Sequence, residues 1–272
     1  MTDFTQAIPV LPEPDWIDAM TDFTQAIPVL PEPDWHAVAG IPIVDAGTPL
    51  EALGLSREFS VWPAYHKLGI PHAIPECHAR GEVFERLLRV AAALPGGVRL
   101  VVLDAWRPFA VQQYLYDSLS SALAAHYPRA GEAELERLTR QFVSPPSSSR
   151  EAPSPHLTGG AVDVTLCDAQ GRWLDMGSAF DEAVPASYTA YFERLAEPDT
   201  RQRRVRDHRR LLYHAMLDAG FSNLPSEWWH YDFGDQLWAW HTGATQALFG
   251  PVQLQAMDAL WRQQLQKRPP AD

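Results

Sequence analysis

The chain has few cysteines and no long apolar run. Cys77 and Cys167 are its two thiols among 272 residues, and they lie in dissimilar contexts. That is too few for the disulfide framework of a small secreted domain. No apolar stretch approaches the roughly 20 residues that a helix needs to cross a bilayer. The N-terminus lacks the basic start and apolar core of a signal peptide. We therefore expect a cytoplasmic protein with reduced thiols and no membrane contact.

Basic residues are also in deficit. The 22 lysines and arginines face 34 acidic residues, which gives a formal net charge of −12. Nucleic-acid binding needs cationic surface to neutralise phosphates, so the composition predicts no nucleic-acid partner. The one basic cluster, at residues 201–210, has helical spacing and is typical of a solvated helix face.

The N-terminus contains a repeat. Residues 1–16, "MTDFTQAIPVLPEPDW", recur without change at 20–35. A single identical duplication is not the signature of a solenoid, which needs several diverged units. We expect residues 1–39 to be a proline-rich segment, poorly ordered or peripheral, and residues 40–272 to form one domain. With 46% hydrophobic residues over its whole length, the chain is long enough for a substantial core.

Periodicity predicts the main elements of that domain. Helices are expected at 83–94, 108–127, 132–142, 206–221 and 252–267, and strands at 98–106, 160–168 and 227–233. A proline- and serine-rich loop covers 143–155. Because strands and helices do not alternate regularly, the pattern favours an α+β fold over a doubly wound parallel sheet.

The stretch "SPHLTGGAVDVTL" places His156 in a glycine-rich loop and Asp163 in the strand that follows. An imidazole nitrogen and a carboxylate oxygen are both zinc ligands. Taken alone, the pair is more simply read as a loop histidine and a strand aspartate that never meet.

A second stretch, "SEWWHYDFG", changes that balance. His230 would complete a three-ligand metal site with an open position, as catalytic zinc sites have. Glu227, three residues earlier, would act as a general base on water and then as a proton donor. The competing interpretation is an aromatic core segment with a surface glutamate, but packing alone does not require an acid and a histidine there.

A third stretch, "LDAWRPFA", places Arg107 at the end of a buried strand. A guanidinium in that position can stabilise a developing oxyanion. A structural ion pair between Arg107 and a carboxylate is an equally good explanation of this motif.

Together these stretches resemble the D-alanyl-D-alanine dipeptidase family, the vancomycin-resistance type of zinc dipeptidase (peptidase family M15). The match runs through "DAWRP", "SPHLTGGAVDVTL", "MGSAFDE", "AGF" and "SEWWHYDFG", in that order, over roughly residues 55–240. The resemblance implies a single compact α+β domain in which a small antiparallel sheet bears the zinc site and helices surround it.

Carried over residue by residue, the resemblance implies one Zn²⁺ per chain, held by His156, Asp163 and His230. Glu227 falls on the catalytic base, and Arg107 on the residue that stabilises the tetrahedral intermediate. The implied partner is a small dipeptide substrate that contains D-amino acids.

The resemblance also implies which residues hold the amino end of the substrate. Ser154 and Asp181 match two of them. A family tyrosine that helps there corresponds to Phe59 in "REFSVWPAY", which keeps the wall and loses the hydroxyl, although Tyr65 could substitute from nearby. Strict selectivity for D-alanyl-D-alanine is therefore less secure than the hydrolytic chemistry.

Two other functions stay open at this point. The first is a related zinc D,D- or L,D-carboxypeptidase that trims cell-wall peptides. The second is a peptide-binding relative that keeps the fold and the metal without catalysis. An intact glutamate at position 227 disfavours the second, since a binder needs no base. Neither the oligomeric state nor the physiological role follows from the sequence.

Overall fold

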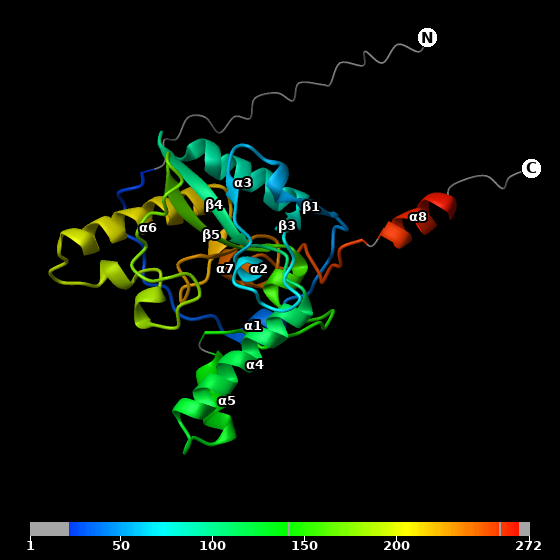
Figure 1. The fold of residues 1–272 in the computed structure, drawn as a ribbon, viewed down its shortest axis with the longest axis horizontal. Coiled ribbons are helices and arrows are strands. Elements are labelled where there is room, and N and C mark those ends of the chain that lie inside the picture. The colour runs from blue at the N-terminus through cyan, green and yellow to red at the C-terminus, as the bar shows by residue number, and fades with distance from the viewer. Residues whose placement is uncertain (1–21, 141, 256, 267–272) are drawn as a thin grey trace, which may run out of the picture.

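The computed structural model describes residues 22–140, 142–255 and 257–266 (Figure 1). The helices are α1 (Trp35–Ala39), α2 (Ala64–Lys67), α3 (Gly81–Ala93), α4 (Phe109–His126), α5 (Glu132–Arg140), α6 (Thr200–Asp218), α7 (Gln236–Thr242) and α8 (Met257–Gln266). The strands are β1 (Leu50–Ala52), β2 (Ser60–Val61), β3 (His78–Arg80), β4 (Val98–Asp104), β5 (Ala161–Asp168), β6 (Ser222–Asn223) and β7 (His230–Asp232). Helices and strands thus share one mixed α+β domain, as expected.

The main sheet has five strands in the order β2-β4-β5-β7-β6. The pairs β4–β5, β5–β7 and β6–β7 are antiparallel. The pair β2–β4 is parallel, so the sheet expected to be antiparallel is mixed at this edge. A separate antiparallel pair, β1–β3, lies outside this sheet.

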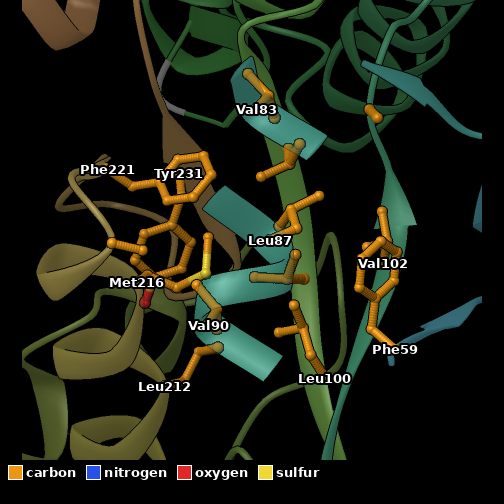
Figure 2. Packing of buried hydrophobic residues seen from close by; sticks show 14 of the residues in the cluster. Phe59, Val83, Leu87, Val90, Leu100, Val102, Leu212, Met216, Phe221 and Tyr231 are labelled. Carbon is orange, nitrogen blue, oxygen red and sulfur yellow. The ribbon is translucent and has the colours of Figure 1, made fainter. Parts of the chain in front are cut away.

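The hydrophobic core lies between the main sheet and two helices. Side chains of α3 and α6 pack on the strands, as Figure 2 shows for Leu87, Val90 and Met216. Along β5, Val162 and Val164 belong to this core. Successive side chains of a strand point to opposite faces, so Asp163 between them faces the other side of the sheet. The predicted ligands Asp163 and His230, which pair across β5 and β7, lie on that second face.

Helix α6 begins six residues before the expected start at 206. Asp199 caps it: its side chain accepts from the backbone N–H of Gln202, and the Gln202 side-chain oxygen accepts from the backbone N–H of Asp199. The basic cluster therefore lies on this helix, as its spacing indicates.

One member of the basic cluster is not solvated. Arg209 is 2% exposed, and its guanidinium donates to the carbonyl oxygens of Met176, Tyr188 and Ala186. These bonds secure the loop between β5 and α6, which carries Asp181.

The second copy of the N-terminal repeat packs on the domain from residue 22 onward, while the first copy lies outside the described residues. Ile27 is buried against Ala190 and Tyr213. The guanidinium of Arg210 donates to the carbonyl oxygen of Thr24, 2.7 Å away. These contacts anchor the segment to the domain, and a domain boundary at residue 40 stays a prediction.

Helices α4 and α5 extend away from the sheet, as Figure 1 shows. Both lie within a residue or two of their expected ranges, whereas α8 begins later than the expected 252. Within the described residues, no helix is long and apolar enough to span a membrane.

Candidate metal centre

Three neighbouring strands place polar side chains in one row across the sheet. Asp163 on β5 lies opposite His230 on β7 and opposite Asp104 on β4. The pairing with Asp104 depends on a register shift between Val102 and Asp104. Such a bulge inserts one residue and redirects the side chains after it. It brings the Asp104 carboxylate to the face that holds Asp163.

His156 reaches the same row from a short 3₁₀ turn, Pro155–Thr158, just before β5. The turn ends at Gly159, whose φ of 72° is in the left-handed region that favours glycine. At Gly160 a Cβ atom would lie 2.5 Å from the carbonyl oxygen of Phe233. The two glycines of the motif therefore permit the tight turn that brings His156 toward Asp163.

The three predicted ligands converge. The His156 Nε2 and His230 Nδ1 atoms are 3.2 Å apart. Asp163 lies between them, with Oδ1 3.2 Å from His230 Nδ1 and Oδ2 3.4 Å from His156 Nε2. All three residues are buried, and their ligand atoms lie within 4.8 Å of one another.

The outer nitrogens of both imidazoles are engaged elsewhere. His156 Nδ1 is 2.8 Å from the carbonyl oxygen of Ala105, which can only accept, so this nitrogen carries the proton. His230 Nε2 is 2.8 Å from the carboxylate of Asp232. The nitrogens that face the centre are therefore lone-pair donors in the neutral rings.

This donor set fits a divalent cation. Two imidazole lone pairs and a carboxylate converge at separations where only a shared proton or a cation relieves their repulsion. Outer partners that orient ligating imidazoles are a regular feature of metal sites. Ligands of this N/O type suit zinc and do not exclude other first-row divalent ions.

Electrostatics keeps the central carboxylate ionised. Burial alone would raise the pKa of Asp163, but the adjacent His156 and His230 outweigh it and hold that pKa below its usual range. For His230, burial acts to lower the pKa, and the carboxylates of Asp232 and Asp163 raise it above its usual value. A charged carboxylate and a neutral imidazole are the forms that bind metal, so a bound cation takes the place of the proton that these carboxylates favour on His230.

Glu227 lies beside this centre, with its Oε2 atom 3.9 Å from His230 Nδ1 and its side chain 20% exposed. The turn that carries it is held by Asn223, whose side-chain amide donates to the carbonyl oxygens of Glu227 and His230. Burial raises the pKa of Glu227 to about 8, and His230 acts in the opposite direction. A cation at the ligands would also lower this pKa, because it favours the carboxylate.

Arg107 is buried and makes three side-chain hydrogen bonds. Its guanidinium donates to Asp104 at 2.8 Å, to Gln112 at 2.7 Å and to Asp163 at 3.0 Å. It also stacks over the ring of Tyr65, 4.7 Å from the ring centre. Arg107 thus forms structural ion pairs and also lines the pocket, although the sequence left these two interpretations as alternatives.

Tyr65 and Asp181 form a polar pair in the same pocket, with the tyrosine hydroxyl donating to the carboxylate at 3.2 Å. Desolvation there raises the pKa of Asp181 to about 6, against the effect of Arg107. Asp181 has a φ of 61°, a strained value for a residue other than glycine. Strain of this kind is concentrated at functional sites.

Two predicted substrate residues lie elsewhere. Phe59 is 2% exposed and packs edge-to-face against Phe84 in the core, so it does not line the pocket, and Tyr65 occupies the wall instead. Phe59 directly precedes the short edge strand β2, which pairs with β4. This position places the Phe59 ring in the main hydrophobic core. The Ser154 hydroxyl accepts from the backbone N–H of Ser147 and lines a neighbouring cavity, apart from Asp181.

The pocket thus contains the three predicted ligands, an acid, a guanidinium and a tyrosine–carboxylate pair. Three ligands with an acid alongside are typical of metal-dependent hydrolases, which leave one coordination position open.

Comparison with known proteins specifies the class further. The family model for D-Ala-D-Ala dipeptidases, Peptidase_M15, matches residues 75–247. The D-alanyl-D-alanine dipeptidase of Synechocystis sp. is 34% identical over 217 residues, which cover 74% of this chain and 87% of that protein. The Escherichia coli protein of that name is 32% identical, over 53% of this chain and 59% of its own length. The chain belongs to the D-alanyl-D-alanine dipeptidase family of M15 peptidases.

Among solved structures, the chain is similar to the vancomycin-resistance D,D-dipeptidase VanXYg in complex with a D-Ala-D-Ala phosphinate analogue. The two are 17% identical with a TM-score of 0.34, over 76% of this chain and 69% of the other.

Sequence reasoning missed two carboxylates at this centre. Asp104 lies three residues before Arg107 in the motif "LDAWRP", and Asp232 lies two residues after His230 in "HYDFG". On a strand, residues two apart share a face, so the position of Asp232 was available from the sequence as a signal. The contact of Asp104 was not, because it depends on the bulge in β4.

Replacing Asp232 with asparagine should weaken zinc binding by about 10- to 100-fold, the usual cost of losing a partner that orients a ligating histidine. The variant removes the carboxylate that fixes His230 Nε2. Competition titration against a chromogenic chelator measures the affinity. Asp175→Asn is the control, since Asp175 pairs with Arg201 on the surface. Equal affinities for the two variants would show that Asp232 does not position the ligand.

Proposed function

We propose that the chain is a zinc-dependent dipeptidase that hydrolyses D-alanyl-D-alanine or a closely related D-amino-acid dipeptide. The observation that carries the proposal is the convergence of His156, Asp163 and His230 in one pocket with Glu227. Membership of the dipeptidase family supports the substrate class. We assign the three converging residues as the ligands of one zinc ion per chain.

Glu227 is the proposed general base and acid. When bound, zinc supplies Lewis acidity next to the scissile carbonyl and increases the acidity of water there. Glu227 takes the proton from the attacking water and delivers it to the amine that leaves. The role is supported by the place of its carboxylate beside the proposed ligands, with Oε2 3.9 Å from His230 Nδ1.

Arg107 is the proposed stabiliser of the oxyanion. Its guanidinium is already oriented by Asp104 and Gln112, so no reorganisation is needed when charge develops on the substrate. The same contacts explain why the residue is buried without losing its charge.

The amino end of the substrate is assigned to Asp181 and Tyr65. A carboxylate at a fixed distance from the metal recognises a free ammonium group and rejects longer chains on that side. The tyrosine hydroxyl holds the carboxylate in place at 3.2 Å. The assignment transfers to Tyr65 the role that the sequence comparison gave to position 59. A contact between Ser154 and the substrate stays a prediction, since its hydroxyl is bonded to the backbone of the preceding loop.

The test is amino-acid release from D-Ala-D-Ala, from its L,D and L,L counterparts and from an N-acetylated D-Ala-D-Ala, with zinc-loaded and chelator-treated protein. The proposal expects release from the free D,D-dipeptide alone, lost with chelator and restored by zinc. Cleavage of the acetylated peptide as well would point to a carboxypeptidase. Stoichiometric zinc binding without cleavage of any of these peptides would instead favour a peptide-binding protein.

A further inference from the structure

One wall of the catalytic pocket comes from the N-terminal segment, outside the residues 75–247 that match the family model. Trp35, the first residue of α1, lines the pocket together with Glu227 and His230. Helix α1 is held in place by Val38, which packs against Leu224 and Leu237. Trp35 therefore lines the pocket from a part of the chain far from the proposed ligands in sequence.

A second cavity, of about 320 Å³, adjoins this pocket. Four residues line both spaces and so form the wall between them: Trp35, Ser144, Pro155 and Leu237. Tyr65 and Asp181 line the catalytic pocket and not this cavity. The cavity thus lies on a side of the pocket away from the pair assigned to the substrate ammonium.

Trp35 contributes the largest side chain to this wall. Leu237 is 1% exposed and belongs to the packing beneath α1, and Pro155 precedes a ligand in its 3₁₀ turn. Trp35 is 43% exposed, so its indole can be truncated with little loss of core packing. Its removal would join the catalytic pocket to the cavity.

We propose that Trp35 sets the length limit of the substrate at its carboxyl end. The inference rests on the proposed function: with the ammonium at Asp181 and the scissile carbonyl at the ligands, the second residue extends away from Asp181. On that side the indole of Trp35 occupies the volume that a third residue would need. The cavity behind it falls within the about 300–1,000 Å³ typical of ligand sites, so it is large enough to receive one.

The experiment compares zinc-loaded wild type with Trp35→Ala on three peptides: D-Ala-D-Ala, the tripeptide D-Ala-D-Ala-D-Ala, and N-acetyl-D-Ala-D-Ala. Trp35→Ala should raise kcat/KM for cleavage of the first peptide bond of the tripeptide by about tenfold or more. It should bring no gain on the acetylated peptide, because the amino end is unchanged. Trp35→Phe, which keeps an aromatic ring, should stay close to the wild type.

Trp173→Ala is the matched control. Trp173 is 47% exposed and packs against Trp62, and it lines neither the catalytic pocket nor the cavity. This variant should leave the profile over the three peptides as in the wild type. A gain on the tripeptide in both alanine variants would indicate general loosening and would overturn the role of Trp35, as would no gain in Trp35→Ala.

A binding measurement separates failure of this inference from failure of the proposed function. Calorimetry with phosphinate analogues of the dipeptide and of the tripeptide does not depend on turnover. Wild type should bind the dipeptide analogue at least about tenfold more tightly, and Trp35→Ala should reduce that ratio to within about threefold. If no peptide is cleaved yet the ratio changes in this way, the proposed function is wrong, but the role of Trp35 in limiting ligand length is supported. If the enzyme is active and the ratio is unchanged, the role of Trp35 is wrong and the proposed function is unaffected.

Discussion

Replacing Glu227 with glutamine should lower kcat for D-Ala-D-Ala by about 10²- to 10⁴-fold, the range that a positioned acid–base group contributes. Glutamine has nearly the same shape as glutamate and cannot accept a proton from water. The backbone turn is held by Asn223 through main-chain carbonyls, so it should persist in the variant. Steady-state kinetics with zinc-saturated protein measures the effect.

Zinc affinity distinguishes a chemical role of Glu227 from a structural one. The proposed ligands do not include Glu227, so the variant should bind zinc as the wild type does. Glu58→Gln, on an exposed residue, controls for the loss of one negative charge. If the variant keeps more than about one-tenth of the wild-type kcat, the loss is smaller than the lowest loss expected on removing a general base. The proton transfer would then be assigned to another group.

Replacing His156 with alanine should remove the metal and with it the activity. One of three ligands is lost, together with the bond from Nδ1 to the Ala105 carbonyl that orients it. We expect zinc affinity to fall by more than the about 10- to 100-fold that loss of an outer partner costs. Hydrolysis should then drop to the level of chelator-treated wild type, as measured by amino-acid release at fixed zinc concentration.

Thermal unfolding checks the same prediction without an activity assay. A ligand present at 100 times its dissociation constant stabilises the folded state by about 2.7 kcal/mol. Wild type should therefore unfold at a higher temperature when zinc is added, and His156→Ala should show no such rise. His66→Ala, on an exposed histidine of α2, should keep the zinc-dependent rise. A rise of equal size in His156→Ala would exclude His156 as a ligand.

Much of the secondary structure was predictable because it depends on local spacing. The helical spacing of apolar residues along 83–94 predicts α3, and the β-branched run that begins at Val98 predicts β4. The start of α6 was missed because its cap at Asp199 lies upstream of the apolar pattern that signalled the helix. The parallel pairing of β2 was not predictable, since a strand of two residues carries no periodicity.

The sequence by itself determined which residue types are available for a metal centre. Resemblance to a family, rather than spacing alone, supplied the expectation that His156, Asp163 and His230 converge. The glycines between the first two ligands, and the period of two that links His230 to Asp232, are local features with a direct physical meaning. Both depend only on residues close together in the chain, so the sequence is enough to define them.

Only the tertiary structure decided which aromatic residues reach the pocket. Phe59 and Tyr65 are six positions apart, and packing against Phe84 takes the first into the core while the second meets Arg107 and Asp181. Trp35 reaches the site because α1 docks on residues nearly 200 positions away, Leu224 and Leu237. The environment of a side chain is set by whatever packs against it from distant parts of the chain, and local sequence does not encode those neighbours.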